Sequence, residues 1–334
     1  MRRALSLLLT VLLLATAFSG CSQTSSAADR ADERFVILST IFPPYDWVRQ
    51  IIGDNADNFE LSILTDSGVD LHNFQPSVSD IARISSSDMF IYVGGHSDAW
   101  VAEVLSGTVN PNIIVINLMD VLGDAVSLQA YHDHDHHDHD DHHDHDHDHD
   151  HDHDHDQSED EHVWLSLNFA KIFSTAIANA LAELDPDNAD QYSANLATYI
   201  GKLWALNAEF EAVVSGATVR TLLFADRFPF LYLMEDYGLS HYAAFPGCHA
   251  ETEASFTTIA FLIGRVNELG LTSILVTESS DQSIARTIAR DSDGTPQILV
   301  LNSMQSITAA DMENGVTYLS IMESNLDVLR EALR

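Results

Sequence analysis

The most unusual chemistry in this sequence lies in residues 132–156, which consist entirely of 13 His and 12 Asp. Near pH 7 most imidazoles are neutral and the carboxylates are ionised, so we expect the tract to bind Zn²⁺, Ni²⁺ or Cu²⁺ weakly at several places. Because the tract has no apolar side chain to bury, we expect it to be a disordered loop. A solvated low-complexity insertion that only tolerates metal is the alternative interpretation.

Five histidines lie outside this tract and are the candidates for an ordered metal site: His72, His96, His162, His241 and His249. His72 lies in the segment LHNFQPS (residues 71–77), between an expected strand and an expected helix. The ends of strands are where α/β proteins place ligand groups. His162 lies in EHVWL (residues 161–165), the first ordered segment expected after the tract. Neither segment has the HExxH spacing of a hydrolytic zinc site.

Short apolar runs rich in β-branched residues alternate with helical patterns in two parts of the chain, residues 34–131 and 215–334. In the first part we expect strands at residues 35–38, 61–64, 89–93 and 113–116, and helices at 45–52, 77–84 and 99–105. In the second part we expect strands at 221–224, 241–245, 273–277 and 298–301. The sequence therefore predicts an α/β fold of two lobes, each with a parallel sheet and covering helices.

One long helix is expected between these lobes. Apolar residues recur every three or four positions after Pro186, which indicates an amphipathic helix over about residues 187–214. At 1.5 Å per residue this helix would be roughly 40 Å long, enough to brace both lobes. The predicted organisation is an N-terminal metal-binding lobe (34–185, with the disordered loop at 132–160), a linking helix (186–214) and a C-terminal lobe (215–334).

The first 20 residues have the pattern of a secretory signal, because Arg2 and Arg3 precede the apolar run 4–18. The run ends in FSGC, which resembles the lipobox of bacterial lipoproteins, so we expect Cys21 to carry lipid. An ordinary secretory signal that is cut nearby is the alternative. Residues 21–33 are small and polar and are expected to form a flexible tether. We thus expect an exported protein, lipid-anchored to the outer face of the cytoplasmic membrane or periplasmic.

The charge and the apolar content exclude two classes of protein. Acidic residues outnumber basic residues 51 to 15, and the formal net charge of -36 would repel a phosphate backbone. We therefore expect no binding of nucleic acid. No apolar run reaches the roughly 20 residues that span a bilayer, which excludes a multi-pass membrane protein.

The two histidine segments and the predicted architecture together resemble the metal-specific solute-binding proteins of ABC importers, the zinc- and manganese-binding family. Residues 71–77 are similar to the first-ligand pattern H-x-[YF]-x-P-[ST] of that family, and residues 161–165 to its second-ligand pattern PHVWL. The resemblance extends over essentially the whole mature chain. It implies that His72 and His162 bind the metal in a cleft between the lobes, and that the His-rich loop marks a zinc-specific member.

The resemblance also implies ligands from the second lobe, where this sequence departs from the family pattern. The third ligand of the family, a His or Glu, falls within residues 224–228, where Asp226 is the only metal donor and Arg227 is an alternative partner for it. The fourth, an Asp, falls near residues 301–305, which contain no carboxylate. Two further candidates follow expected strands: Glu278 and His249.

The function that the resemblance implies is capture of Zn²⁺ and its presentation to an ABC permease, without catalysis. Zn²⁺ is expected in preference to Mn²⁺, because two imidazoles suit a borderline ion whereas Mn²⁺ favours carboxylate-rich shells. We expect a monomer whose partners are the divalent metal and the permease. Two alternatives stay open: a surface adhesin or metal buffer that acts through the tract, and a zinc hydrolase, which would need three ligands, an open position and a general base.

Overall fold

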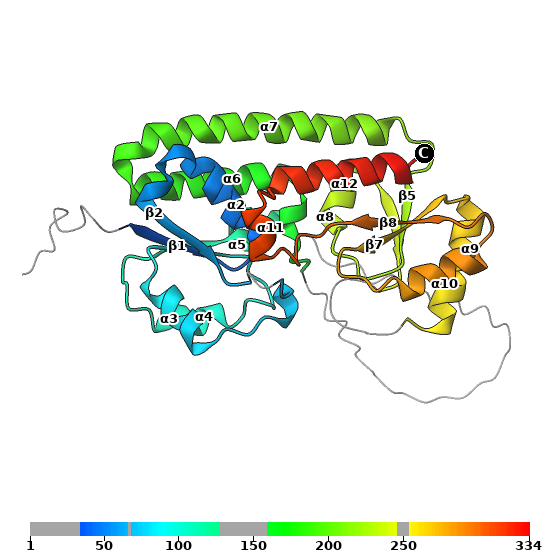
Figure 1. Cartoon of the computed structure of the whole chain (residues 1–334), viewed down its shortest axis with the longest axis horizontal. Coiled ribbons are helices and arrows are strands. Elements are labelled where there is room, and N and C mark those ends of the chain that lie inside the picture. Colours follow the sequence, from blue (N-terminus) through cyan, green and yellow to red (C-terminus); the bar gives the residue numbers. More distant parts are fainter. Residues whose placement is uncertain (1–33, 66–67, 127–158, 246–253) are drawn as a thin grey trace, which may run out of the picture. The chain divides into compact units, whose positions relative to one another are not determined.

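The computed structural model describes residues 34–65, 68–126, 159–245 and 254–334, which form two four-stranded parallel sheets (Figure 1). The first sheet has the order β2-β1-β3-β4 and consists of β1 (Phe35–Ser39), β2 (Phe59–Ile63), β3 (Met89–Tyr92) and β4 (Ile114–Asn117). The second repeats this order as β6-β5-β7-β8, with β5 (Thr221–Phe224), β6 (Ser240–Ala243), β7 (Ser273–Thr277) and β8 (Gln297–Leu301). The predicted pair of parallel sheets is confirmed.

Successive side chains of each strand point to opposite faces of its sheet, and both faces are covered. In β1, Ile37 joins the largest buried cluster of the molecule, whereas its neighbour Leu38 joins a smaller cluster on the other face. In β7, Leu275 joins the large cluster and Val276 packs on the opposite face. Burial on both faces explains why these strands are continuous apolar runs in the sequence.

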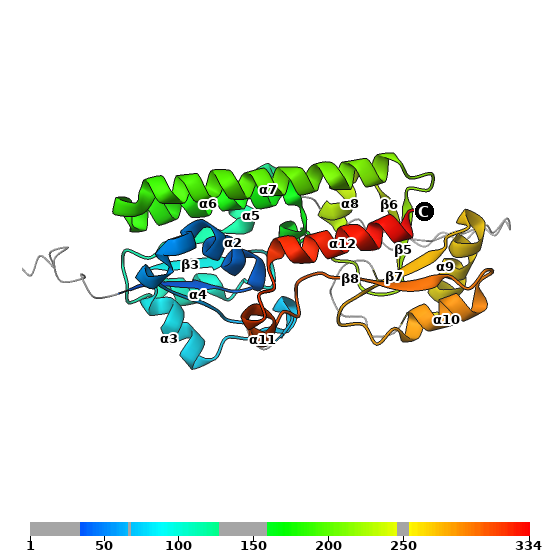
Figure 2. The ribbon, with the colours of Figure 1, turned by 45° about the horizontal axis from the view of Figure 1, so that its top comes forward.

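The helices of the first lobe are α2 (Phe42–Ile52), α3 (Val78–Ser86), α4 (Val101–Ser106), α5 (Leu118–Leu122) and α6 (Leu167–Leu184). Two prolines in the first turn of α2 suit the start of a helix, because proline fixes a helical φ and the first turn needs no intrahelical N–H bond. A capping box between Ser77 and Asp80 starts α3. Figures 1 and 2 show α3 and α4 on the side of the first sheet away from α2 and α6.

The helices of the second lobe are α8 (Leu231–Tyr237), α9 (Phe256–Leu269), α10 (Ser283–Asp291), α11 (Ala309–Glu313) and α12 (Tyr318–Ala332). Leu262 of α9 and Ile288 of α10 pack with Val276 on one face of the second sheet. Leu233 of α8 and Leu326 of α12 belong to the large cluster on the other face.

The long linking helix is present as α7 (Ala189–Ser215), and it contacts α2 and α6 of the first lobe and α8 and α12 of the second. Near its start, Asn195 Nδ2 donates a hydrogen bond of 2.9 Å to Ile51 O. Further along, Asn207 Oδ1 accepts one of 3.0 Å from Tyr237 Oη. The helix is therefore bonded to both lobes.

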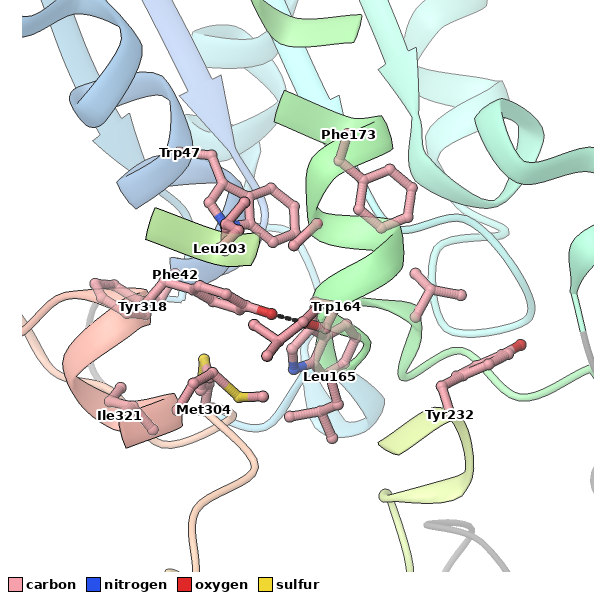
Figure 3. Close-up of a cluster of buried hydrophobic side chains, with 14 of the residues drawn as sticks. Phe42, Trp47, Trp164, Leu165, Phe173, Leu203, Tyr232, Met304, Tyr318 and Ile321 are labelled. Carbon is pink, nitrogen blue, oxygen red and sulfur yellow. Dashed lines mark hydrogen bonds between the residues drawn. The ribbon is translucent and has the colours of Figure 1, made fainter. Parts of the chain in front are cut away.

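One hydrophobic core extends through both lobes, and Figure 3 shows its central part. Trp164 lies at this centre. Its Nε1 donates to Ser303 O at 2.9 Å, and its carbonyl oxygen accepts from Tyr318 Oη at 2.8 Å. Trp47 of α2 stacks on Phe173 and meets the edge of Tyr318. Because these side chains come from both lobes, neither lobe has a complete core of its own on this side.

Four predictions fall outside the described residues: the signal peptide (1–20), the tether with Cys21 (21–33), the His/Asp tract (132–156) and the placement of His249. Among the described helices, none is both long and apolar enough to cross a membrane.

Candidate metal centre

His72 is held in the turn that follows β2. The turn is a short 3-10 helix (Leu71–Asn73), and Asp70 caps it by accepting a hydrogen bond of 3.0 Å from His72 N. Leu71 is buried and anchors this turn in the core. The Nδ1 atom of His72 lies 2.7 Å from Ser97 Oγ, in the loop after β3. With its side chain only 7% exposed, His72 has little freedom to rotate.

His162 directly precedes a buried 3-10 turn (Val163–Leu165), which fixes its backbone. Asp160 Oδ1 accepts a 2.8 Å hydrogen bond from His162 N and lies 2.9 Å from Nδ1 of the same residue. Both side chains are buried. The ring of Trp164 packs edge-on against that of His162, with the centroids 5.2 Å apart. Asp160 and Trp164 thus set the orientation of the His162 ring.

The two histidines present their remaining nitrogens to each other, with Nε2 of His72 3.1 Å from Nε2 of His162. Zinc–nitrogen bonds are about 2.0–2.1 Å long, so the nitrogens of two tetrahedral ligands lie about 3.3 Å apart. A carboxylate at the far ring nitrogen, such as Asp160 at His162, is also a usual support of a metal-bound imidazole. The structure brings the two predicted histidines together in a geometry that suits one ion.

Asp226 follows β5 in the second lobe, as predicted, and its carboxylate accepts three hydrogen bonds. Thr277 donates two of them to Oδ2, from Oγ1 at 2.8 Å and from N at 3.2 Å, and the backbone N of Arg227 donates to Oδ1 at 2.8 Å. The guanidinium of Arg227 lies 3.9 Å from Asp70 Oδ2, so this ion pair joins the second lobe to the loop that carries His72.

Glu278 follows β7 directly, and its carboxylate binds the loop after β8. It accepts hydrogen bonds from Ser303 N at 2.8 Å, Ser303 Oγ at 2.9 Å and Gln305 N at 3.2 Å. Residues 301–305 have no carboxylate of their own, and Glu278 supplies one to them. In this structure Glu278 therefore fixes the loop to which Trp164 is bonded.

The second-lobe candidates do not join the histidine pair in this conformation. Within the four described stretches of the chain, no group of three or more His, Cys, Asp or Glu side chains is arranged to hold a metal ion. His249 lies in residues 246–253, outside those stretches. The assignments of Asp226, Glu278 and His249 accordingly stay predictions.

Buried acidic residues beside the histidines were missed in the sequence: Asp98, Asp160 and Glu161. Asp98 Oδ2 accepts hydrogen bonds from Val93 N at 2.9 Å and Gly94 N at 3.1 Å. Burial, together with a smaller effect of the charge of Glu161, raises the pKa of Asp98 to about 7 against these hydrogen bonds. The sequence DEH at residues 160–162 could have indicated the roles of Asp160 and Glu161, because acidic residues next to a candidate ligand histidine can reach its ring.

The fold and the site define the class: a two-lobed α/β protein in which two buried histidines face each other, one of them in the turn after β2. The chain belongs to the family described as zinc-uptake complex component A, periplasmic, which matches residues 37–332. This confirms the predicted family. The family is one of zinc-uptake components and not of enzymes, in agreement with the prediction that the chain catalyses nothing.

Individual relatives agree with this membership. The zinc-binding protein AdcA of Streptococcus pyogenes is 28% identical over 327 residues, which cover 97% of this chain and 61% of AdcA. The high-affinity zinc uptake system protein ZnuA of Bacillus subtilis is 28% identical over 320 residues, 96% of this chain and 94% of that protein. The Zn(II)-bound ZnuA-like domain of Streptococcus pneumoniae AdcA superposes with a TM-score of 0.69 at 26% identity, over 90% of this chain and 99% of the domain. The chain thus spans 61% of the streptococcal AdcA from S. pyogenes.

Proposed function

We propose that this protein is the extracytoplasmic receptor of a zinc importer, which captures Zn²⁺ between its lobes and delivers it to an ABC permease. The observation that carries this proposal is the buried pair of His72 and His162, whose Nε2 atoms face each other at 3.1 Å. Membership of a zinc-uptake family and relatives named for zinc binding support it. Cys21 would carry the lipid that holds the receptor, as a monomer, at the outer face of the membrane.

The proposed coordination shell combines the two imidazoles of the first lobe with at least one ligand from the second. Asp226 is the first candidate, because it follows β5 and would exchange its bonds to Thr277 for the metal. Glu278 and His249 are the others. A metal bound by both lobes favours the conformation in which all ligands reach it, so binding would shift the population toward that conformation.

The metal is proposed to be Zn²⁺ rather than Mn²⁺. Two imidazole nitrogens suit zinc, which prefers nitrogen and sulfur ligands in a tetrahedron, whereas Mn²⁺ prefers more oxygen ligands. The His/Asp tract would add weaker sites, which are separate from the buried pair in both chemistry and affinity.

Competition against a tight zinc chelator tests this function, because such a chelator keeps weak sites empty. The wild-type chain should take up one equivalent of Zn²⁺, and His72→Ala and His162→Ala should each lose most of it. His241→Ala is the matched control, since His241 lies on β6 and stacks on Phe228. Equal uptake by all four proteins, or metal analysis of protein purified without added metal that finds no zinc, would contradict the proposal.

A further inference from the structure

Glu161 connects the segment of one histidine to the ring of the other. It directly precedes His162 in the chain, yet its carboxylate points to the loop that supports His72. Oε1 accepts a hydrogen bond of 2.9 Å from Ser97 N, and the hydroxyl of the same Ser97 lies 2.7 Å from His72 Nδ1. Oε2 lies 3.5 Å from His72 Nδ1. The two oxygens of Glu161 thus reach His72 through Ser97 and directly.

The charge of Glu161 is buried and only partly compensated. Its side chain is 3% exposed, and Oε2 makes no hydrogen bond within the part of the chain that the structure describes. Asp98, a second buried carboxyl, is close enough for the two charges to oppose each other. Buried carboxylates in proteins are normally paired with a cation or bound to a metal. Here the ion-pair contact of Glu161 is the ring of His72.

The loop after β3 is shaped around this carboxylate. Gly95 has a φ of 73°, and a Cβ there would lie 2.5 Å from Glu161 Oε1 and 2.7 Å from Glu161 Cγ. Any larger residue would push the carboxylate out of its place. The close approach of the Gly95 backbone and the hydrogen bond from Ser97 N together hold Glu161 in one position.

From this arrangement we propose that Glu161 is a positioning residue of the metal centre: it fixes the His72 ring through Ser97 and places a buried negative charge behind that ring. The inference rests on the proposed function, since it concerns the same ion. A hydrogen-bonded carboxylate behind an imidazole orients the ring and makes the opposite nitrogen a better donor. Glu161 therefore supports the His72 ring as Asp160 supports the His162 ring, and a bound cation would compensate the negative charges of the two carboxylates.

The test uses Glu161→Gln in the full chain, in competition with a tight zinc chelator. Glutamine keeps an acceptor for Ser97 N and removes only the charge. We expect a 10- to 100-fold loss of zinc affinity, the usual effect of removing such a supporting group. The melting temperature of the metal-free protein should stay the same or rise, because a buried, poorly compensated charge is gone. A residue with a purely structural role would show the opposite, since its loss lowers stability.

The matched control is Asp46→Asn, which also removes a buried charge. Asp46 accepts hydrogen bonds from Arg49 and from Tyr318 N, and contacts neither histidine through them. It should lower the melting temperature and leave zinc affinity unchanged. Equal zinc affinity of Glu161→Gln and wild type would overturn the inference about Glu161 but not the proposed function. A loss of affinity that is explained by a loss of stability would overturn that inference as well. If wild type itself takes no zinc from the chelator, the proposed function fails first.

Discussion

The facing pair of histidines owes its geometry to the groups at the opposite ring nitrogens. Asp160 holds His162, and Ser97 with Glu161 holds His72, so rotation of either ring would break a buried hydrogen bond. Leaving such a buried group without its partner costs about 1–3 kcal/mol. The two Nε2 atoms are consequently held in place without a metal, and if they bind the ion as we propose, little ordering of these side chains is needed on binding.

Asp226 is the first candidate for the proposed metal ligand from the second lobe. We expect Asp226→Ala to weaken Zn²⁺ binding by several kcal/mol, about as much as loss of either histidine, because each removes one metal ligand. Thr277→Val is the control, since it removes the hydroxyl donor to Asp226 and keeps the carboxylate. Chelator competition measures both. If His249→Ala alone abolished binding while Asp226→Ala had no effect, the site would contain three histidines instead.

The raised pKa of Asp98 predicts that the stability of the protein depends on pH. Burial raises its pKa from 3.8 to about 7, so between these values the folded chain holds a proton that the unfolded chain has lost. The unfolding free energy should therefore fall as the pH rises through this window, by roughly 2–4 kcal/mol from this carboxyl alone. Asp98→Asn should remove that part of the slope in denaturant titrations from pH 4 to pH 8.

The control for Asp98 is Asp311→Asn at the start of α11. Hydrogen bonds from Thr308 lower the pKa of Asp311, so its contribution is present above the unfolded pKa and is lost as the pH falls. Because the shift of Asp311 acts only below 3.8, Asp311→Asn should leave the slope between pH 4 and pH 8 unchanged, whereas Asp98→Asn should reduce it. An unchanged slope in Asp98→Asn would mean that the buried carboxyl stays ionised through the whole window.

At the scale of elements, the loop after β8 is held by three different parts of the chain. Glu278 binds its backbone from the end of β7, Asn325 of α12 binds Asn302, and Trp164 donates to Ser303 O. Met304 adopts a φ of 64° within this loop and is buried in the shared core. The loop is therefore a junction between the second lobe and the segment that carries His162.

Glu278→Ala should release the loop after β8 from the end of β7. It leaves the buried N–H of Ser303 without an acceptor, and we expect a loss of about 2–4 kcal/mol in unfolding free energy. Because Trp164 would become more exposed to water, its fluorescence should shift to the red in the folded protein. Glu278→Gln, which keeps one acceptor oxygen, should lose less. Unchanged stability with a large loss of zinc affinity would instead identify Glu278 as a ligand.

The elements that the sequence predicted best are those whose pattern is local. All eight strands lie where apolar, β-branched runs predicted them, and α7 lies within two residues of its expected bounds, because periodicity within one segment determines both. Ser97 could not be found in this way, since it lies 25 residues after His72 and only the packing of β1 between β2 and β3 brings the two loops together. Glu278 was found, but its bonds to the loop after β8 depend on a strand pairing that the sequence does not specify.

At the scale of the whole molecule, the lobes share a core and two bracing helices. The helix α7 is hydrogen-bonded to both lobes, and α12 begins with Tyr318, whose N donates to Asp46 of α2 at 2.8 Å. A wide opening of the lobes would expose the cluster around Trp164 to water, at about 25 cal/mol for each Å² of apolar surface. Binding should thus involve small shifts of the loops that carry Asp226 and His72 rather than a large hinge motion.

The last prediction distinguishes a tight zinc site in the lobes from weak sites in the His/Asp tract. Removal of residues 132–156 should leave one tight zinc site, because His72 and His162 keep their buried partners, and should abolish the weak sites, because 13 of the 18 histidines are gone. The matched control replaces the tract by 25 Gly and Ser residues, which keeps the entropy of loop closure nearly the same. Calorimetric titration with Zn²⁺ should give one equivalent for both variants and several more for the wild type. A protein that acted only as a metal buffer through the tract would lose nearly all binding in both variants, because no tight site would remain in the lobes.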